Sequence, residues 1–291
     1  MAEHGAPRVI PGVLGTGGAA GIGLEPDLGP LFFVVGAFDG LHRGHTYLLR
    51  RLREVAARHG ARPGVITFDH HPDEVLVGSA PPVLCDPIER LVRFGRDGVA
   101  VVVIQHFDAT VRMTPFQDFV AAIAGRVELA GFLMTPDAAF GHERRGTPTT
   151  LAALGRQAGF AVEVVEPFDI DGHHVRSNEI RAEIARGELQ AASHLLGRSV
   201  AVVGRPEGVG ADRSHGLVPV AFELPVALPP TGRYRVDLEP AWTPGRARAA
   251  RRSPSIAVVD PAGSLSLEVR RPAALPAADR LRIRLIGQAS R

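Results

Sequence analysis

The sequence predicts an α/β fold in which a doubly wound parallel sheet is followed by a smaller, all-β barrel-like domain. From residue 31 to about residue 197, short apolar runs alternate with segments whose apolar residues recur every three or four positions. This alternation is typical of the strands and helices of a parallel sheet. After about residue 200 the chain consists of short β-like runs separated by proline and glycine. We therefore expect a flexible leader over residues 1–30, an α/β domain over 31–199 and a β domain over 200–291.

Each element follows from a local pattern. Continuous apolar runs predict buried parallel strands, and a period of three to four predicts helices with one apolar face. The leader contains one candidate strand at residues 9–10. The predicted strands of the α/β domain are 31–36, 64–68, 99–104, 129–134 and 160–165. The predicted helices between them are 44–59, 87–96, 115–125 and 149–159. The predicted strands of the β domain are 200–203, 218–224, 234–238, 255–259, 264–269 and 281–285.

Ligands of doubly wound sheets bind at the carboxyl ends of the strands. In this chain that rule brings together five loops, namely residues 37–45, 67–76, 107–113, 135–146 and 175–181. We expect the functional residues to lie in these loops.

Composition narrows the classes of partner. The net charge of +2 gives no overall basic field, so nucleic acid is not an expected partner. No apolar run has the length of a membrane helix, so no membrane partner is expected. Cys85 is the only cysteine, which excludes an intrachain disulfide and predicts a cytoplasmic protein. The chain contains no lysine, so phosphate charge must be met by arginine, histidine, backbone N–H groups and metal.

Two biased segments carry weaker signals. The glycines of residues 15–21 follow no predicted strand, which favours a linker over a dinucleotide-binding turn. Residues 245–252, GRARAARR, predict a solvated basic loop, with a phosphate or nucleic-acid contact as the alternative.

The most informative segment is residues 34–49, VVGAFDGLHRGHTYLL, where a strand passes through a glycine-rich turn into a helix. Gly36, Gly40 and Gly44 allow the backbone to approach an anion closely. The first turn of the helix supplies unpaired N–H groups and the positive end of the helix dipole. His42 and His45 add ring donors at the same place. The combination predicts a phosphate site.

This G-x-F-D-G-x-H-x-G-H pattern resembles that of the bacterial FAD synthetases, which are bifunctional riboflavin kinase/FMN adenylyltransferases. The resemblance covers about residues 31–200 and implies a Rossmann-like nucleotidylyltransferase fold. It implies that His42 and His45 act on the phosphates at the reacting centre. It further assigns to the nucleotide site the residues Gly36, Ala37, Phe38, Asp39 and Gly44.

Two other loops extend the resemblance. In TFDHHPDEVL the family pattern includes His71 and Pro72, which imply a corner of the acceptor pocket, whereas His70 stands where the family has proline. A rigid turn explains this His-Pro corner equally well. In the loop after residue 134, the flavin pocket is implied at Asp137, Phe140, Gly141 and Arg144. There Ala138 and Ala139 replace bulky residues, which weakens stacking on a flavin ring.

The segment VRSNEIR resembles the family's I-S-S-T-x-I-R. Ser177 is a predicted helix N-cap, and Arg181 lies one turn further along the helix. With Asn178, these residues are predicted to clamp the triphosphate of the nucleotide. Arg181 is therefore predicted to be catalytic.

The C-terminal segment resembles the family's riboflavin kinase barrel in degenerate form. Its best match to the kinase's G-x-P-T-A-N motif is residues 216–222, where Val220 and Phe222 replace the threonine and asparagine. Oxygen ligands for a hard cation are thus missing, and no kinase activity is expected.

The sequence as a whole predicts transfer of AMP from Mg²⁺-ATP to FMN, giving FAD and pyrophosphate, without a resident protein-bound metal. Three alternatives remain open from the residues. In the first, the chemistry is kept but a different phosphorylated small molecule replaces FMN, or CTP replaces ATP. In the second, the protein is a catalytically weak nucleotide or flavin sensor. In the third, His42, His45, His70 and His71 bind zinc. For the histidine pair alone, a merely polar helix start is a further reading. The oligomeric state is not predicted.

Overall fold

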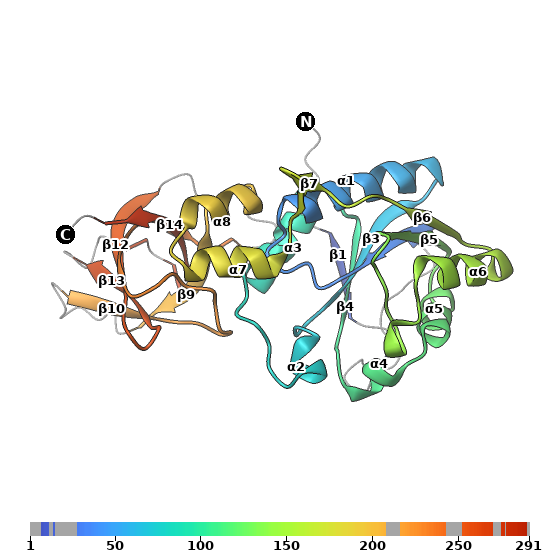
Figure 1. The fold of residues 1–291 in the computed structure, drawn as a ribbon, viewed down its shortest axis with the longest axis horizontal. Helices are drawn as coiled ribbons and strands as arrows, with labels where there is room; N and C mark the ends of the chain where they lie inside the picture. The colour runs from blue at the N-terminus through green and yellow to red at the C-terminus, as the bar shows by residue number, and fades with distance from the viewer. Residues whose placement is uncertain are drawn as a thin grey trace. The chain divides into compact units, whose positions relative to one another are not determined.

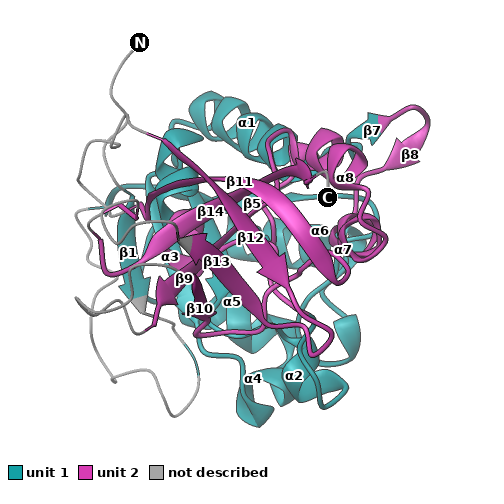
Figure 2. Cartoon of the chain, turned by 90° about the vertical axis from the view of Figure 1, so that its left-hand side faces the viewer, with its two compact units in different colours: residues 1–38, 44–81, 91–169 teal, residues 39–43, 82–90, 170–291 magenta. Residues whose placement is uncertain are grey.

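The computed structural model describes residues 7–11, 14, 28–207, 216–242, 252–269, 275–276 and 278–289. The predicted linker at residues 15–21 and the basic segment 245–251 lie outside these residues. The chain divides into two compact units, coloured separately in Figure 2. Unit 1 comprises residues 1–38, 44–81 and 91–169, and unit 2 comprises residues 39–43, 82–90 and 170–291. Among the described helices, none is long and apolar enough to cross a membrane.

Unit 1 contains a six-stranded, fully parallel sheet in the order β1-β4-β3-β2-β5-β6. All five predicted strands are present within two residues of their expected ends. The predicted strand at residues 9–10 is also present and pairs with β4 at the edge of the sheet. The bounds are β1 Arg8–Pro11, β2 Leu31–Val35, β3 Arg62–Phe68, β4 Val101–Gln105, β5 Leu129–Met134 and β6 Ala161–Val164.

Helices follow these strands as expected for a doubly wound sheet. The strand order runs outward from β2 through β3 to β4, then reverses to β5 and β6. Right-handed crossovers therefore place α1 on the opposite face from α5 and α6, as Figure 1 shows. The four predicted helices are confirmed within one residue; two short helices, α2 and α4, lie in segments predicted as loops. The bounds are α1 Arg43–Arg58, α2 Asp73–Leu76, α3 Pro87–Arg96, α4 Ala109–Met113, α5 Phe116–Ala124 and α6 Pro148–Ala158, with a 3₁₀ turn at His142–Arg144.

The register of the sheet is fixed by aromatic packing over glycines. A Cβ at Gly64 would lie 2.5 Å from the Phe33 ring, and a Cβ at Gly131 would lie 2.5 Å from the Phe32 ring. Both phenylalanines are fully buried. Because only glycine leaves room for these rings, β2 is locked between β3 and β5. These three strands carry the site.

Unit 2 contains a closed antiparallel barrel in the order β10-β13-β12-β11-β14-β9. All six strands predicted for the β domain are present within three residues of their expected ends. The barrel begins at β9, close to the predicted domain boundary at residue 200, although the compact unit also takes in two helices ahead of it. The bounds are α7 Ser177–Ala185, α8 Leu189–Leu196, β9 Ala201–Pro206, β10 Gly216–Ala221, β11 Gly232–Pro240, β12 Ser253–Val259, β13 Leu265–Val269 and β14 Leu281–Gln288. The short strands β7 (Asp169–Ile170) and β8 (His173–His174) form a small sheet of their own.

Candidate active site

Unit 1 contains a pocket of about 500 Å³ at the carboxyl ends of its strands. Its floor is formed by the last residues of β2 and β5, between which the strand order reverses. That reversal is where open α/β sheets bind their ligands. The walls are mostly apolar, with aromatic side chains from the ends of β3 and β4. The pocket is large enough for a flat aromatic ligand.

Four of the six predicted acceptor residues line this pocket: Pro72, Phe140, Gly141 and Arg144. Ala138 and Ala139, which stand where the resemblance implies bulky residues, also line it. The other two predicted residues make local contacts beside it. Asp137 accepts a hydrogen bond from Thr135 at 2.8 Å, and its backbone oxygen accepts one from Arg144 at 3.1 Å.

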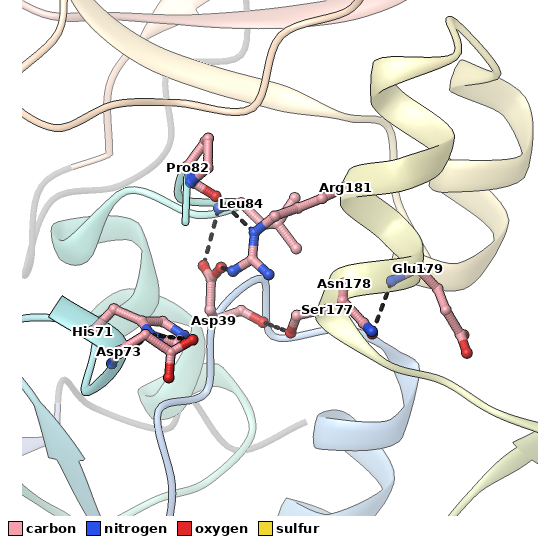
Figure 3. A network of polar contacts seen from close by, with 9 residues as sticks. All are labelled: Asp39, His71, Asp73, Pro82, Leu84, Ser177, Asn178, Glu179 and Arg181. Atoms are coloured by element: carbon pink, nitrogen blue, oxygen red, sulfur yellow. Dashed lines mark hydrogen bonds and ion pairs between the residues drawn. The ribbon is translucent and has the colours of Figure 1, made fainter. Parts of the chain in front are cut away.

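The sixth residue, His71, shapes the turn into α2. Its Nδ1 accepts the backbone N–H of Asp73 at 3.2 Å, drawn in Figure 3. The His71 ring is thereby held at the N-terminal end of this short helix. This contact matches the rigid-turn interpretation of the His-Pro corner, while Pro72 itself lines the pocket.

Gly141 is where the loop after β5 requires glycine. Its φ is +76°, and a Cβ there would lie 2.7 Å from backbone atoms of Phe116. Phe140 next to it packs against the rings of Phe119 and Phe132 in the core, with ring centroids 5.4 and 5.8 Å away. The loop is therefore anchored to the body of unit 1 and presents a preformed wall to the pocket.

The glycine-rich loop after β2 is tightly held. The N–H of Gly36 donates to Ile66 at 3.0 Å, and the hydroxyl of Thr67 donates to the backbone oxygen of Ala37 at 3.2 Å. Phe38, with φ of +52°, is buried at 2% exposure. Such a backbone conformation persists only where the surroundings enforce it. The loop is thus pre-organised before any ligand binds.

Asp39 anchors the continuation of this loop within unit 2. One carboxylate oxygen accepts the N–H of Leu84 at 3.0 Å, and the other pairs with the Arg181 guanidinium. The hydroxyl of Ser177 donates to the backbone oxygen of Asp39 at 2.9 Å. Figure 3 shows these contacts converging on Asp39. Asp39 therefore holds the loop in place.

The structure brings Arg181 and Ser177 to the loop as predicted, but not in the predicted manner. The expected N-cap role of Ser177 is wrong, because α7 begins at Ser177 and its N-cap is Arg176, without a side-chain cap. The Ser177 hydroxyl bonds instead to Asp39. Arg181 uses two donors on Pro82 and Asp39. The side chain of Asn178 accepts the N–H of the next residue, Glu179, at 3.0 Å.

Arg198 was not singled out from the sequence, where it was only part of a connecting segment. Its guanidinium donates to the backbone oxygens of Gly40 and Leu41, the latter at 3.0 Å. Gly40 itself has φ of +82° and faces Leu84 and Leu196. Arg198 is a positioning residue for the loop. No local sequence pattern predicts this role of Arg198, because its partners lie about 157 residues away in the chain.

His42 is buried at 5% exposure, and its burial, with the nearby Arg198 charge, lowers its pKa from 6.5 to about 4. The imidazole is therefore neutral at physiological pH. A neutral ring offers one N–H donor and one acceptor. His42 can thus position a phosphate oxygen by a hydrogen bond, but in this state it supplies no positive charge.

His45 lies in the first turn of α1, which begins at Arg43. Its ring packs against that of Phe38, with centroids 5.1 Å apart. Gly44 precedes it in the same turn. The first N–H groups of a helix and its positive dipole end favour an anion there. The site thus has the donors that a phosphate needs.

A second polar cluster in unit 1 was not anticipated: Asp69, His70 and His106. The Nδ1 atom of His106 lies 2.6 Å from one Asp69 oxygen, and that of His70 lies 3.1 Å from the other. Burial alone would raise the pKa of Asp69, but the hydrogen bonds from His106 and His70 outweigh it and lower the pKa. The same bond raises the pKa of His106. The sequence carried part of the signal, because these residues follow two predicted strands, but the structure shows that the two strands are neighbours.

The four-histidine zinc interpretation receives no such support. Among the described residues, the one group of three or more His, Cys, Asp or Glu side chains with ligand spacing is Asp69, His70 and His106. Only His70 of the four histidines belongs to it.

In the barrel, the segment aligned with the kinase motif forms β10. Val220, within β10, is buried at 7% exposure, and Phe222 directly follows the strand. Neither provides an oxygen ligand from its side chain.

Comparisons with known proteins agree with this architecture. The family model for FAD synthetase matches residues 25–179. A bifunctional riboflavin kinase/FMN adenylyltransferase of Pseudomonas fluorescens is 30% identical over 219 residues, which is 74% of this chain and 70% of that protein. The equivalents from Haemophilus influenzae and Listeria monocytogenes are 30% and 32% identical, and the matches span 56% and 52% of their lengths.

A solved structure shares the fold at lower identity. A protein of Streptococcus pneumoniae described as a macrolide-efflux protein superposes with a TM-score of 0.72 at 19% identity, covering 97% of this chain and 91% of the other. At that identity only the fold is shown. With the family model matching more than half of the chain, the conclusion is that the chain belongs to the FAD synthetase family.

Proposed function

We propose that this chain is an FMN adenylyltransferase. A phosphate oxygen of FMN attacks the α-phosphorus of ATP, the bond between that phosphorus and the bridging oxygen to the β-phosphate breaks, and pyrophosphate leaves. The observation that carries the proposal is the largely apolar pocket of about 500 Å³ at the β2/β5 reversal, beside the glycine-rich loop. Its shape suits a flavin ring, and the loop suits phosphates.

Catalysis in this scheme is positioning and charge stabilisation. Two like charges at contact distance repel by roughly 4 kcal/mol at an effective dielectric near 20, so an anionic acceptor must be forced towards the triphosphate. We assign His42 and His45 to the phosphates at the reacting centre and Mg²⁺ to ATP, as part of the substrate. Arg181 and Ser177 are assigned to the β- and γ-phosphates. Since Arg181 uses two of its five N–H donors on the chain itself, the others serve the nucleotide.

The C-terminal barrel is proposed to lack riboflavin kinase activity. A hard cation requires oxygen ligands, and Val220 and Phe222 stand where the kinase motif has threonine and asparagine. Its role is then structural or associative. The protein would depend on FMN made elsewhere.

The test is pyrophosphate release from Mg²⁺-ATP by the full chain with FMN, with riboflavin and without acceptor, followed by chromatography of the flavin product. We expect FAD to form only in the reaction that contains FMN, and we expect no FMN to form from riboflavin. FMN formed from riboflavin would contradict the loss of the kinase. ATP binding without pyrophosphate release with either flavin would contradict adenylyl transfer to FMN and favour a sensor.

A second candidate, transfer to a different phosphorylated acceptor, is favoured by one observation. Ala138 and Ala139 line the pocket and leave space where the family carries bulkier side chains. A panel of phosphorylated acceptors in the same assay separates the two. A turnover number higher with a non-flavin acceptor than with FMN would select the second candidate.

Restoring a bulky aromatic side chain at residue 139 is expected to strengthen FMN binding. An aromatic stacking contact contributes about 0.5–1.5 kcal/mol, so Ala139→Phe should lower KM for FMN by roughly 2- to 10-fold. KM for ATP should change little. The matched control is Ala158→Phe at the exposed end of α6, which does not line the pocket. Equal KM values for FMN in both variants would place the acceptor elsewhere.

A further inference from the structure

We propose that Asp69, His70 and His106 form a binding site for a divalent transition metal of the Zn²⁺ type. One ligand atom from each side chain lies within 4.8 Å of the other two. The two imidazole Nδ1 atoms face the two oxygens of one carboxylate, at 2.6 and 3.1 Å. A metal at about 2.0–2.2 Å from each ligand would replace the protons that now join these groups.

The ligands are held by the sheet rather than by mobile chain. Asp69 and His70 directly follow β3, and His106 directly follows β4. These strands pair in parallel with Phe68 opposite Gln105, and the N–H of Asp69 donates to Gln105 at 3.2 Å. Gln105 is fully buried and donates from its side chain to the backbone oxygen of His106 at 2.9 Å. The three ligands are therefore positioned by neighbouring rigid elements, as metal sites require.

The donor set selects the class of metal. Two imidazoles and one carboxylate suit Zn²⁺, Co²⁺ or Ni²⁺, whereas Mg²⁺ prefers oxygen ligands alone. The site is therefore distinct from the Mg²⁺ that accompanies ATP. The three side chains are 33%, 46% and 43% exposed, which leaves room for water in the remaining coordination positions. An open site of this kind has three protein ligands.

Metal binding there would join two walls of the pocket. Phe68 and Pro72 flank Asp69 and His70 in the chain, Phe107 follows His106, and all three line the pocket. A bound ion would cross-link the loops after β3 and β4 and so stiffen this wall. We expect the metal to raise the thermal stability of the chain, since it binds the folded state.

The experiment uses the full chain, stripped with a chelator and free of nucleotide and flavin. Zn²⁺ alone is titrated calorimetrically, and Co²⁺ serves as a visible-absorption probe of the ligand set. We expect one site per chain and a rise in Tm with Zn²⁺. His70→Gln and His106→Gln should each weaken affinity at least about 10-fold, because even outer-shell substitutions cost a metal site that much.

The control is His173→Gln, an exposed histidine on β8 outside the cluster, which should bind as the wild type does. Wild-type affinity retained in the His70→Gln/His106→Gln double variant, or no binding to the wild type, would overturn the proposal. His70 and His106 follow two different strands. If one single variant fails to fold, the other single variant still tests the proposal. Metal affinity and Tm are measured without turnover, so this test of the metal site does not depend on whether the chain catalyses adenylyl transfer.

Discussion

Replacing His45 by alanine is expected to lower kcat for adenylyl transfer by roughly 10²- to 10³-fold, the typical cost of removing one pre-organised donor to a developing charge. His45 lies in the first turn of α1, where backbone N–H groups and the helix dipole add to its effect. Its ring is held against Phe38, so the donor is oriented before the substrates bind. Because the hydrogen bond from His45 is made chiefly in the transition state, its loss should change KM less than kcat.

The measurement is steady-state pyrophosphate release at saturating ATP and FMN, with Tm recorded for each protein. The matched control is His59→Ala, immediately after the other end of the same helix, where the histidine pairs with Glu163 at 3.1 Å. The control should retain turnover. A His45→Ala enzyme with wild-type kcat would refute the assignment, provided that its Tm is unchanged.

The second large effect concerns pH. The pKa of His42 is about 4 in the folded chain, against 6.5 for an ordinary histidine, because burial and the Arg198 charge disfavour the imidazolium. Between pH 6.5 and about 4, His42 is therefore protonated in the unfolded chain but remains neutral in the folded chain. The stability that the folded chain has with a neutral His42 is therefore fully present above pH 6.5. It is lost as the pH falls from 6.5 towards 4, so the free energy of unfolding decreases over this range. At 1.36 kcal/mol for each pKa unit, the loss is about 3 kcal/mol.

His42→Gln should remove this dependence. Denaturant unfolding is followed between pH 4 and 7 for both proteins, and the difference between the two curves isolates His42 from the other titrating groups. We expect the wild type to lose about 3 kcal/mol more than the variant over this range. Parallel curves would show that the His42 imidazole is accessible and titrates normally, which would contradict the buried loop geometry.

The elements of the fold could be predicted closely because they depend on local pattern. Helix α3 and strand β5 coincide with their predicted bounds, and the six barrel strands follow short runs between proline and glycine. The reversal of strand order next to β2 also follows from the crossover rules once the strands are known. The missed helices α2 and α4 have four and five residues, too few for a periodic pattern to be visible.

The sequence by itself determined the fold class, the family and the position of the loop that is predicted to bind phosphate, because periodicity, turn glycines and a contiguous motif are all local signals. Only the tertiary structure decided which partners the polar side chains take. Ser177 bonds to Asp39 across 138 residues, Arg181 pairs with Asp39 across 142, and Arg198 reaches the loop across 157. Asp69 and His106, 37 residues apart, meet because β3 and β4 are neighbours. Such contacts depend on how strands and helices pack at a distance, and no window of sequence contains both partners.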